Sequence, residues 1–242
     1  MKATKVLYGL AFGLIIYLGI SSFNGFPFST IKGSGTLSKE TRDLAVFHGI
    51  DAGGAFHITV KQGEPQSVII EADDNIIPVI TTKVKSGILH ISTKESINNS
   101  TKLNVTIVVA NLDMLDLSGA CKLKSTEAIS SNEMEIDCSG ASEIIIGLKC
   151  KKLEIDFSGA STGIFLGKTS TLEIESSGAS KIDCYKMTAN VVSVDASGAS
   201  NISFSADKII KIDASGASSI NYKSNGATLE IETSGAASTH KK

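Results

Sequence analysis

Apolar and polar residues alternate in short stretches along the chain, and this alternation recurs at a nearly constant interval. Each stretch runs into a Ser-Gly-Ala triplet, and the glycines of successive triplets are separated by 21, 19, 19, 20, 18 and 19 residues. The residue three positions before each triplet serine is always aliphatic: Leu115, Ile136, Ile155, Ile174, Val194, Ile212 and Ile231. Alternation with a period of two predicts β-strands with one buried side.

The alternation resumes after each triplet, so each repeat predicts a strand, a tight corner, a second strand and a looser return. The third repeat departs from this pattern, because Gly163 occupies an apolar position and Ile164 follows it, which indicates a local slip. One repeat cannot bury its apolar side alone, whereas repeats stacked about 4.8 Å apart bury a continuous core. The predicted fold is all-β, a parallel β-helix (β-solenoid) with coils of about 19–20 residues and stacked Ser-Gly-Ala corners.

The triplets are predicted to be structural corners. A tight corner needs a residue with positive φ, which glycine supplies without steric cost. The alanine leaves room for neighbouring coils, and the serine hydroxyls are expected to form a ladder from coil to coil. Counting one degenerate copy, the corner glycines are Gly54, Gly119, Gly140, Gly159, Gly178, Gly198, Gly216 and Gly235.

The degenerate copy places the start of the solenoid well before the regular repeats. The segment 50–60, IDAGGAFHITV, matches the segment 212–222, IDASGASSINY, position by position. We therefore expect a single solenoid domain over residues 31–242, with irregular longer coils or a hairpin over 45–112 and regular repeats over 113–238.

Residues 1–30 form a separate segment. Two lysines precede an apolar run of about 15 residues, which is typical of an export signal. As a helix this run is shorter than the hydrocarbon core of a bilayer, although an uncleaved anchor extending to Phe28 is the alternative. Either reading places the domain outside the cytoplasm, in the periplasm, at the outer membrane surface or outside the cell. Membrane contact is expected only through this segment.

Four cysteines occur in this exported chain: Cys121, Cys138, Cys150 and Cys184. No two of them share a position in neighbouring repeats, and none has the spacing of a metal ligand pair. Buried free thiols are therefore favoured over disulfides. We expect neither a metal site nor a cofactor.

An acidic residue stands two positions before every triplet serine. The resulting file is Asp116, Asp137, Asp156, Glu175, Asp195, Asp213 and Glu232, with Asp51 in the degenerate copy. Four copies add a second acid two positions earlier: Glu135, Glu154, Glu173 and Glu230. The alternation turns both files outward on one face. They are either a solvated ladder that keeps solenoids apart, or a row of oxygen ligands for Ca²⁺ or for cationic groups of a partner.

Catalysis is not expected. Pectin-type lyases need a strong cation, yet Arg42 is the only arginine beside 22 lysines, and it precedes the first corner. Glycosidases need two carboxylates in different environments, and uniform ladders do not separate pKa values. The histidines of the predicted strands, His57 and His90, are interpreted as surface residues. A net charge of −2 does not indicate the basic surface that binds nucleic acid.

Several segments together resemble the auto-transporter adhesin head domain, also called the GIN head domain, of exported Bacteroidetes proteins. These are the lead-in VFHGIDAGGAFHITVKQGEPQSVIIEADDN, the segment TTKVKSGILHIST, the strand LNVTIVVANLDMLDLSGAC and the serial SGAS corners. The resemblance covers roughly residues 40–238. It implies a right-handed parallel β-helix shaped like pectin lyases but without their catalytic residues, and a role in cell-surface adhesion. The chain departs from lipoprotein members, because no cysteine lies near its N-terminal segment.

The sequence thus favours a non-catalytic interaction module of the cell envelope or surface, acting in adhesion through the acidic file. Its expected partner is a surface ligand of unknown identity: a glycan, a matrix component or an envelope protein. Self-association through the solenoid ends is a further expectation. The alternatives are a polysaccharide lyase or glycosidase built on a β-helix, and a purely structural envelope protein.

Overall fold

The computed structural model describes residues 30–242, and their main body is a parallel β-solenoid of about seven turns with about 19 residues per turn. The expected export segment lies almost wholly outside the described residues, and its role stays a prediction. No α-helix occurs in residues 30–242, so this part of the chain has no helix long and apolar enough to cross a membrane. One short 3₁₀ turn, η1, spans Ile77–Val79.

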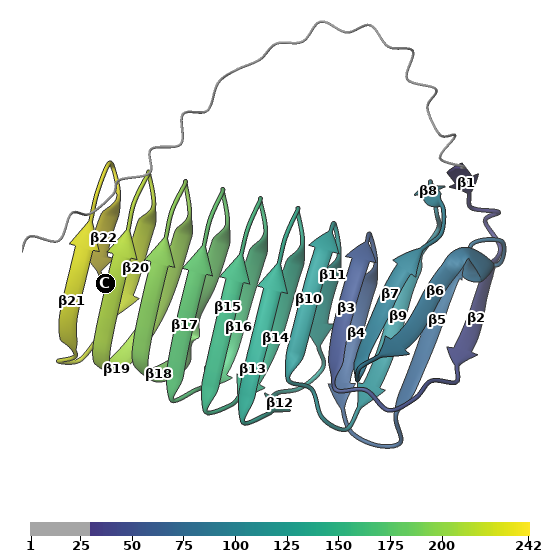
Figure 1. Ribbon diagram of the computed structural model, residues 1–242, viewed down its shortest axis with the longest axis horizontal. Coiled ribbons are helices and arrows are strands. Elements are labelled where there is room, and N and C mark those ends of the chain that lie inside the picture. The colour runs from purple at the N-terminus through teal and green to yellow at the C-terminus, as the bar shows by residue number, and fades with distance from the viewer. Residues whose placement is uncertain (1–29) are drawn as a thin grey trace, which may run out of the picture.

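Two parallel sheets form the faces of the solenoid (Figure 1). Strands that run into the corners form the entry sheet: β3 (Gly49–Gly54), β10 (Met114–Gly119), β13 (Glu133–Cys138), β15 (Lys152–Phe157), β17 (Thr171–Ser176) and β21 (Thr228–Thr233). Strands that leave them form the exit sheet: β4 (His57–Gln62), β11 (Lys122–Ser125), β14 (Glu143–Lys149), β16 (Thr162–Lys168), β20 (Ser219–Lys223) and β22 (Ser238–Lys241). The long strands β18 (Lys181–Ala196) and β19 (Asn201–Ala214) contribute to both sheets, and the short β12 (Ile129–Ser130) pairs with the end of β14.

The order of coils in space differs from their order in the sequence at the N-terminal end. Strand β3 lies between β10 and β7 (Ile88–Thr93), and β4 lies between β11 and β9 (Leu103–Val109). The first coil of the chain is therefore the second coil of the stack. A later segment, β7 with β9, builds the coil outside it.

Antiparallel strands cover that outer coil. Strand β6 (Ile80–Lys85) pairs with β7 as a hairpin, while β5 (Ser67–Asp73) pairs with β9 and β2 (Leu37–Arg42) pairs with β5. A separate parallel pair joins β1 (Thr30–Lys32) to β8 (Ser96–Asn98). The carboxylate of Asp73 is fully buried here and accepts hydrogen bonds from the Gly35 and Thr101 amides, both at 2.7 Å. These bonds lower the pKa of Asp73 and tie the N-terminal strand to the end of the solenoid.

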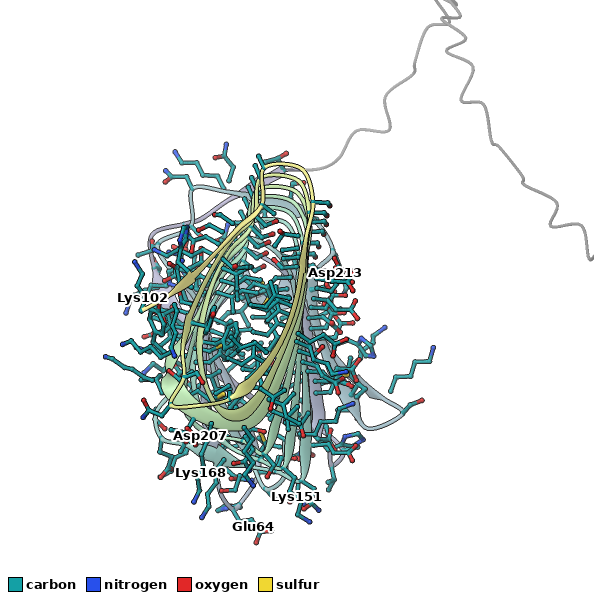
Figure 2. The ribbon with its side chains drawn as sticks, turned by 90° about the vertical axis from the view of Figure 1, so that its left-hand side faces the viewer. Glu64, Lys102, Lys151, Lys168, Asp207 and Asp213 are labelled. Carbon is teal, nitrogen blue, oxygen red and sulfur yellow. The ribbon has the colours of Figure 1, made fainter. Side chains whose placement is uncertain are left out.

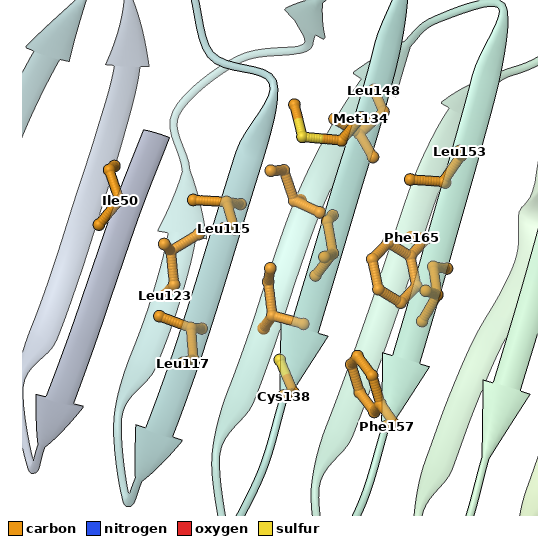
Figure 3. Close-up of a cluster of buried hydrophobic side chains, with 14 of the residues drawn as sticks. Ile50, Leu115, Leu117, Leu123, Met134, Cys138, Leu148, Leu153, Phe157 and Phe165 are labelled. Carbon is orange, nitrogen blue, oxygen red and sulfur yellow. The ribbon is translucent and has the colours of Figure 1, made fainter. Parts of the chain in front are cut away.

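The core is one continuous stack of apolar side chains between the sheets, shown in part in Figure 3. All inward positions three residues before the triplet serine are buried except Ile231, and Leu229 on the same terminal strand is 46% exposed. No further coil covers β21 in residues 30–242. The end of the stack therefore presents an unpaired edge strand.

The third repeat keeps its register at Gly163 and is irregular just after it. Gly163 pairs with Ile144 on one side and with Ile182 on the other, whereas the pairing of β16 with β18 shifts register between Ile164 and Leu166. The rings of Phe157 and Phe165 fill the space beside Gly163, with their centroids 6.0 Å apart in an edge-on arrangement. The apolar volume missing at position 163 is thus supplied from the two neighbouring inward positions.

The corners stack through the main chain (Figure 1). From the corner at Gly119 onward, the amide of the corner alanine donates a hydrogen bond of 2.7 Å to the carbonyl of the corner glycine in the preceding coil, as Ala160 does to Gly140. Gly159 has a φ of +68°, and a Cβ on it would lie 2.5 Å from that same carbonyl oxygen. Glycine is therefore required twice, for its backbone conformation and for the close approach of the next coil.

The expected serine ladder from coil to coil is wrong. The buried serine is the residue after the triplet, and its hydroxyl donates to the carbonyl three residues earlier in its own corner, as Ser161 does to Ser158 at 3.0 Å. Ser142, Ser180, Ser200 and Ser218 repeat this bond. Each hydroxyl satisfies a carbonyl of its own corner, while main-chain amides, such as those of Ser158 and Ala160, connect the corner to the preceding coil.

All four cysteines are free thiols. Cys121, Cys138 and Cys184 are buried, and burial raises the pKa of each thiol. Cys150 is only half-buried, which corrects the expectation of four buried thiols. It lies at a return between the two sheets.

Candidate functional site

The predicted acidic residues form one straight file on the outer side of the entry sheet. The register pairs Asp51 with Asp116, and then in turn Asp137, Asp156, Glu175, Asp195, Asp213 and Glu232. In the view along the solenoid in Figure 2, Asp213 points away from the core on this side. Because successive strands stack about 4.8 Å apart, eight carboxylates follow one another along the solenoid.

The second acidic file is interrupted. Glu135, Glu154 and Glu173 align, but Ser193 and Lys211 occupy the next two positions before Glu230. Lys211 forms an ion pair with Glu230 at 3.1 Å. The face is therefore most acidic over β13, β15 and β17.

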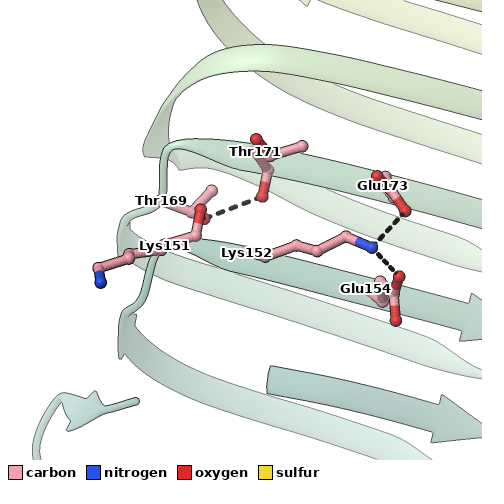
Figure 4. Close-up of polar contacts among 6 residues, drawn as sticks. All are labelled: Lys151, Lys152, Glu154, Thr169, Thr171 and Glu173. Carbon is pink, nitrogen blue, oxygen red and sulfur yellow. Dashed lines mark hydrogen bonds and ion pairs between the residues drawn. The ribbon is translucent and has the colours of Figure 1, made fainter. Parts of the chain in front are cut away.

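Lys152 bridges two carboxylates of this file, which the sequence interpretation missed (Figure 4). Its ammonium group contacts Glu154 and lies 3.1 Å from Glu173. The hydrogen bond from Lys152 lowers the pKa of Glu154. Lys152 lies two residues before Glu154 in one strand, so both side chains point to the same face. The alternation in the sequence could therefore have indicated this contact.

The carboxylates do not share one environment, contrary to the expected uniform ladder. Partial burial, followed by repulsion from Glu135, Asp116 and Asp156, raises the pKa of Asp137 to about 6. Burial and the charge of Asp51 also raise the pKa of Asp116. On the same face, the pKa of Asp137 is therefore raised and the pKa of Glu154 is lowered.

A hollow of about 240 Å³ lies at the most acidic part of the face. Its lining is Glu135, Asp137, Glu154, Ile155, Asp156, Glu173 and Glu175. Six of these seven residues are acids, and Lys152 is the cation that contacts two of them. The hollow suits a cationic group of a ligand.

Substitution of Asp137 by asparagine is expected to stabilise the protein by about 1 kcal/mol near neutral pH, after discounting the pKa shift for solvent screening. The folded-state pKa of about 6 lies above the ordinary value of 3.8, so the wild-type protein gains stability relative to the variant as pH falls between these values. Urea unfolding of both proteins near neutral pH and near pH 4 measures the difference. Asp213→Asn, where Lys211 lies in the neighbouring file, is the control and should gain less; equal gains would contradict the crowding of Asp137.

Two histidines pair with aspartates at the N-terminal end of this face. His90 lies 2.7 Å from Asp51, and His48 lies 2.7 Å from Asp113. Both pairs join segments distant in the sequence, so their contact depended on the coil order that the sequence did not reveal. Within residues 30–242, no cluster of three or more His, Cys, Asp or Glu side chains is arranged to hold a metal ion.

Arg42 has a structural contact. Its guanidinium donates a hydrogen bond to the carbonyl of Ile77 at 3.0 Å and forms an ion pair with Glu40 at 3.0 Å, among the antiparallel strands that cover the outer coil. Tyr222 is buried and stacks with Phe204, while Lys223 lies 4.5 Å from the ring centre of the half-buried Tyr185. Neither tyrosine is an open stacking platform for a sugar.

Comparison with known proteins agrees with this architecture. The family model described as "Putative auto-transporter adhesin, head GIN domain" matches residues 46–226. The chain belongs to this family. None of the curated proteins matches the chain.

Solved structures show the same fold as this GIN domain. A structure from Bacteroides fragilis, described as a "putative adhesin", has a TM-score of 0.83 at 22% identity, and the match covers 88% of this chain and 100% of that one. Another from Parabacteroides merdae has a TM-score of 0.75 at 18% identity, with 88% and 99% covered. A structure from Parabacteroides distasonis, described as a "Putative lipid binding protein", has a TM-score of 0.71 at 16% identity, with 88% and 100% covered. At these identities the likeness concerns the fold.

Proposed function

We propose that this GIN domain is a non-catalytic interaction module of the cell envelope or surface, and that the acidic face of the entry sheet is its contact surface. The observation that carries the proposal is the straight outward file from Asp116 to Glu232, held in register by the stacked corners. A rigid file of charges binds a partner without the entropy cost of ordering a flexible surface.

The charge of the face sets the chemistry of the partner. Carboxylates that are repelled by neighbouring carboxylates, such as Asp137, gain most from a nearby cation. The proposed partner therefore presents amino or other cationic groups at its surface, on a glycan, a matrix component or an envelope protein. Family membership supports the adhesive role, and the export signal predicted for residues 1–30 supports a location outside the cytoplasm.

Replacing Asp137, Asp156 and Asp195 together by asparagine is expected to weaken binding to cells or to immobilised cationic glycans about tenfold or more, because three charges of one file leave the same face. The measurement is a glycan-array and cell-binding assay with the purified full chain. The control variant carries Asp43→Asn, Glu64→Gln and Glu95→Gln, which make the same change in net charge away from this face.

Each other outcome excludes the proposal in a distinct way. Equal loss in both variants would assign binding to net charge. Release of unsaturated or reducing sugars from polyuronates would establish an enzyme. Absence of any binding, together with co-fractionation with a fixed membrane partner, would establish a structural role.

Self-association through the uncovered strand β21 would appear as concentration-dependent mass in gel filtration.

A further inference from the structure

The edge of the solenoid opposite the corners contains a groove. It has a volume of about 520 Å³ and runs across the returns of several consecutive coils. Its lining comprises Ser130, Ser131, Asn132, Lys149, Cys150, Lys151, Lys168, Thr169, Ser170, Thr188, Ala189, Asn190 and Asp207. Figure 2 shows Lys151, Lys168 and Asp207 together at this edge, away from Asp213 on the acidic face.

Small side chains at the bend make this edge concave. Cys150 is half-buried, Thr169 is 7% exposed and Ala189 is 2% exposed, and they occupy successive returns. The Thr169 hydroxyl donates to the carbonyls of Lys151 and Thr171 at 3.1 and 2.9 Å, which fixes this floor (Figure 4). Longer side chains stand only on the two sides of the bend.

Both sides of the groove repeat from coil to coil. On one side Lys149 pairs with Lys168, and Lys168 pairs with Thr188. On the other side the amides of Lys151, Ser170 and Asn190 donate to the carbonyls of Asn132, Lys151 and Ser170 at 2.8, 3.1 and 3.1 Å. A ligand lying along the solenoid axis would meet the same kinds of groups at each coil.

The charge of the groove is opposite to that of the acidic face. Lys149, Lys151 and Lys168 have no ion pair within residues 30–242, although Lys152 next to them pairs with two glutamates. Asp207 is the single acid in the lining and lies on the last coil that the groove reaches. Three uncompensated ammonium groups favour an anionic ligand.

The polar side chains between these lysines are also available. Asn132, Ser170 and Asn190 form a file whose side chains make no hydrogen bond within the described residues, and Thr188 likewise has a free hydroxyl. The lining contains no aromatic residue and no large apolar side chain. It therefore lacks a surface for stacking bases or for covering acyl chains.

We propose that this return groove binds an anionic oligosaccharide that lies along the solenoid axis. Carboxylate or sulfate groups of the sugar contact Lys149, Lys151 and Lys168. Sugar hydroxyls form hydrogen bonds with the side-chain amides and hydroxyls that lie between these lysines. The site is independent of the acidic face and takes a ligand of the opposite charge.

The test measures binding of a short oligogalacturonate to the purified full chain by calorimetry at low salt. The methyl ester of the same oligosaccharide keeps its hydroxyls and removes its charge. Wild-type protein is expected to bind the acid form, to bind the ester about tenfold more weakly or worse, and to lose affinity as salt is raised. The double variant Lys149→Gln/Lys168→Gln should lose about tenfold in affinity for the acid form. Lys83→Gln/Lys85→Gln, on the exposed side of β6, is the charge-matched control and should bind as wild type.

Cys150 supplies a second readout that does not depend on the lysine variants. It is the one cysteine of the four that is not buried, so a thiol reagent modifies it first, and bound oligogalacturonate should slow this reaction saturably. Equal affinity of both double variants, or unprotected Cys150 at saturating ligand, would overturn the proposal. Tighter binding to phosphatidylserine vesicles than to the oligosaccharide would overturn the sugar assignment. The acidic-face variants should bind oligogalacturonate normally, which separates this test from that of the proposed function.

Discussion

Replacing Gly159 by alanine is expected to lower the free energy of unfolding by about 3 kcal/mol. About 1 kcal/mol comes from holding a residue with a Cβ at positive φ. The larger part arises because that Cβ would lie 2.5 Å from the Gly140 carbonyl oxygen, which also accepts the Ala160 amide at 2.7 Å. The corner would have to move away from its neighbour and lose this bond. Urea unfolding followed by circular dichroism measures the change.

Gly226→Ala is the matched control. Gly226 also has positive φ, at +89°, but no atom beyond its two chain neighbours lies within 4 Å of the place that a Cβ would occupy, so only the conformational cost of about 1 kcal/mol applies. The difference between the two variants isolates the close packing of the corners. Equal destabilisation by both would show that backbone conformation alone requires the glycines, and that the coils are not stacked this tightly.

The regular part of the fold could be predicted because every coil repeats the same alternation of buried and exposed side chains around the same corner. Alternation fixes which side chains face inward, and Ile50 to Gly54 match Leu115 to Gly119 in the register that the sequence comparison gave. The N-terminal coil order could not be predicted. Strands β5, β6, β7 and β9 carry no Ser-Gly-Ala corner, so nothing in the sequence indicates that β7 and β9 pack outside β3 and β4.

The candidate surfaces, too, could be predicted from the sequence only in part. The acidic file follows from a period of two and is straight in the structure, whereas the raised pKa of Asp137 depends on carboxylates from neighbouring coils and on partial burial. The return groove left no signal in the sequence, because its lysines and polar residues come from returns that share no motif. A candidate binding surface on a solenoid can therefore lie where the sequence repeat is weakest.

The third repeat provides the second large expected effect, in a pair of substitutions that compensate each other. Gly163→Ile alone should cost at least about 2 kcal/mol, because a Cβ there would lie 2.6 Å from the Phe165 ring and 2.7 Å from the Phe157 ring. Phe157→Ala alone should cost about 3–5 kcal/mol through the cavity left by a fully buried ring.

The double variant Phe157→Ala/Gly163→Ile should recover to within about 1 kcal/mol of the wild type, since the isoleucine fills the volume that the ring vacates. The chain already contains this arrangement in another coil, where Ala196, Ile202 and Phe204 are all buried. Thermal and urea unfolding of the four proteins completes the cycle. Additive losses in the double variant would mean that Phe157 and Gly163 do not share one space, and that the third repeat is irregular for a different reason. Recovery would show that the coils tolerate exchange of volume between the two sheets as long as each layer stays filled.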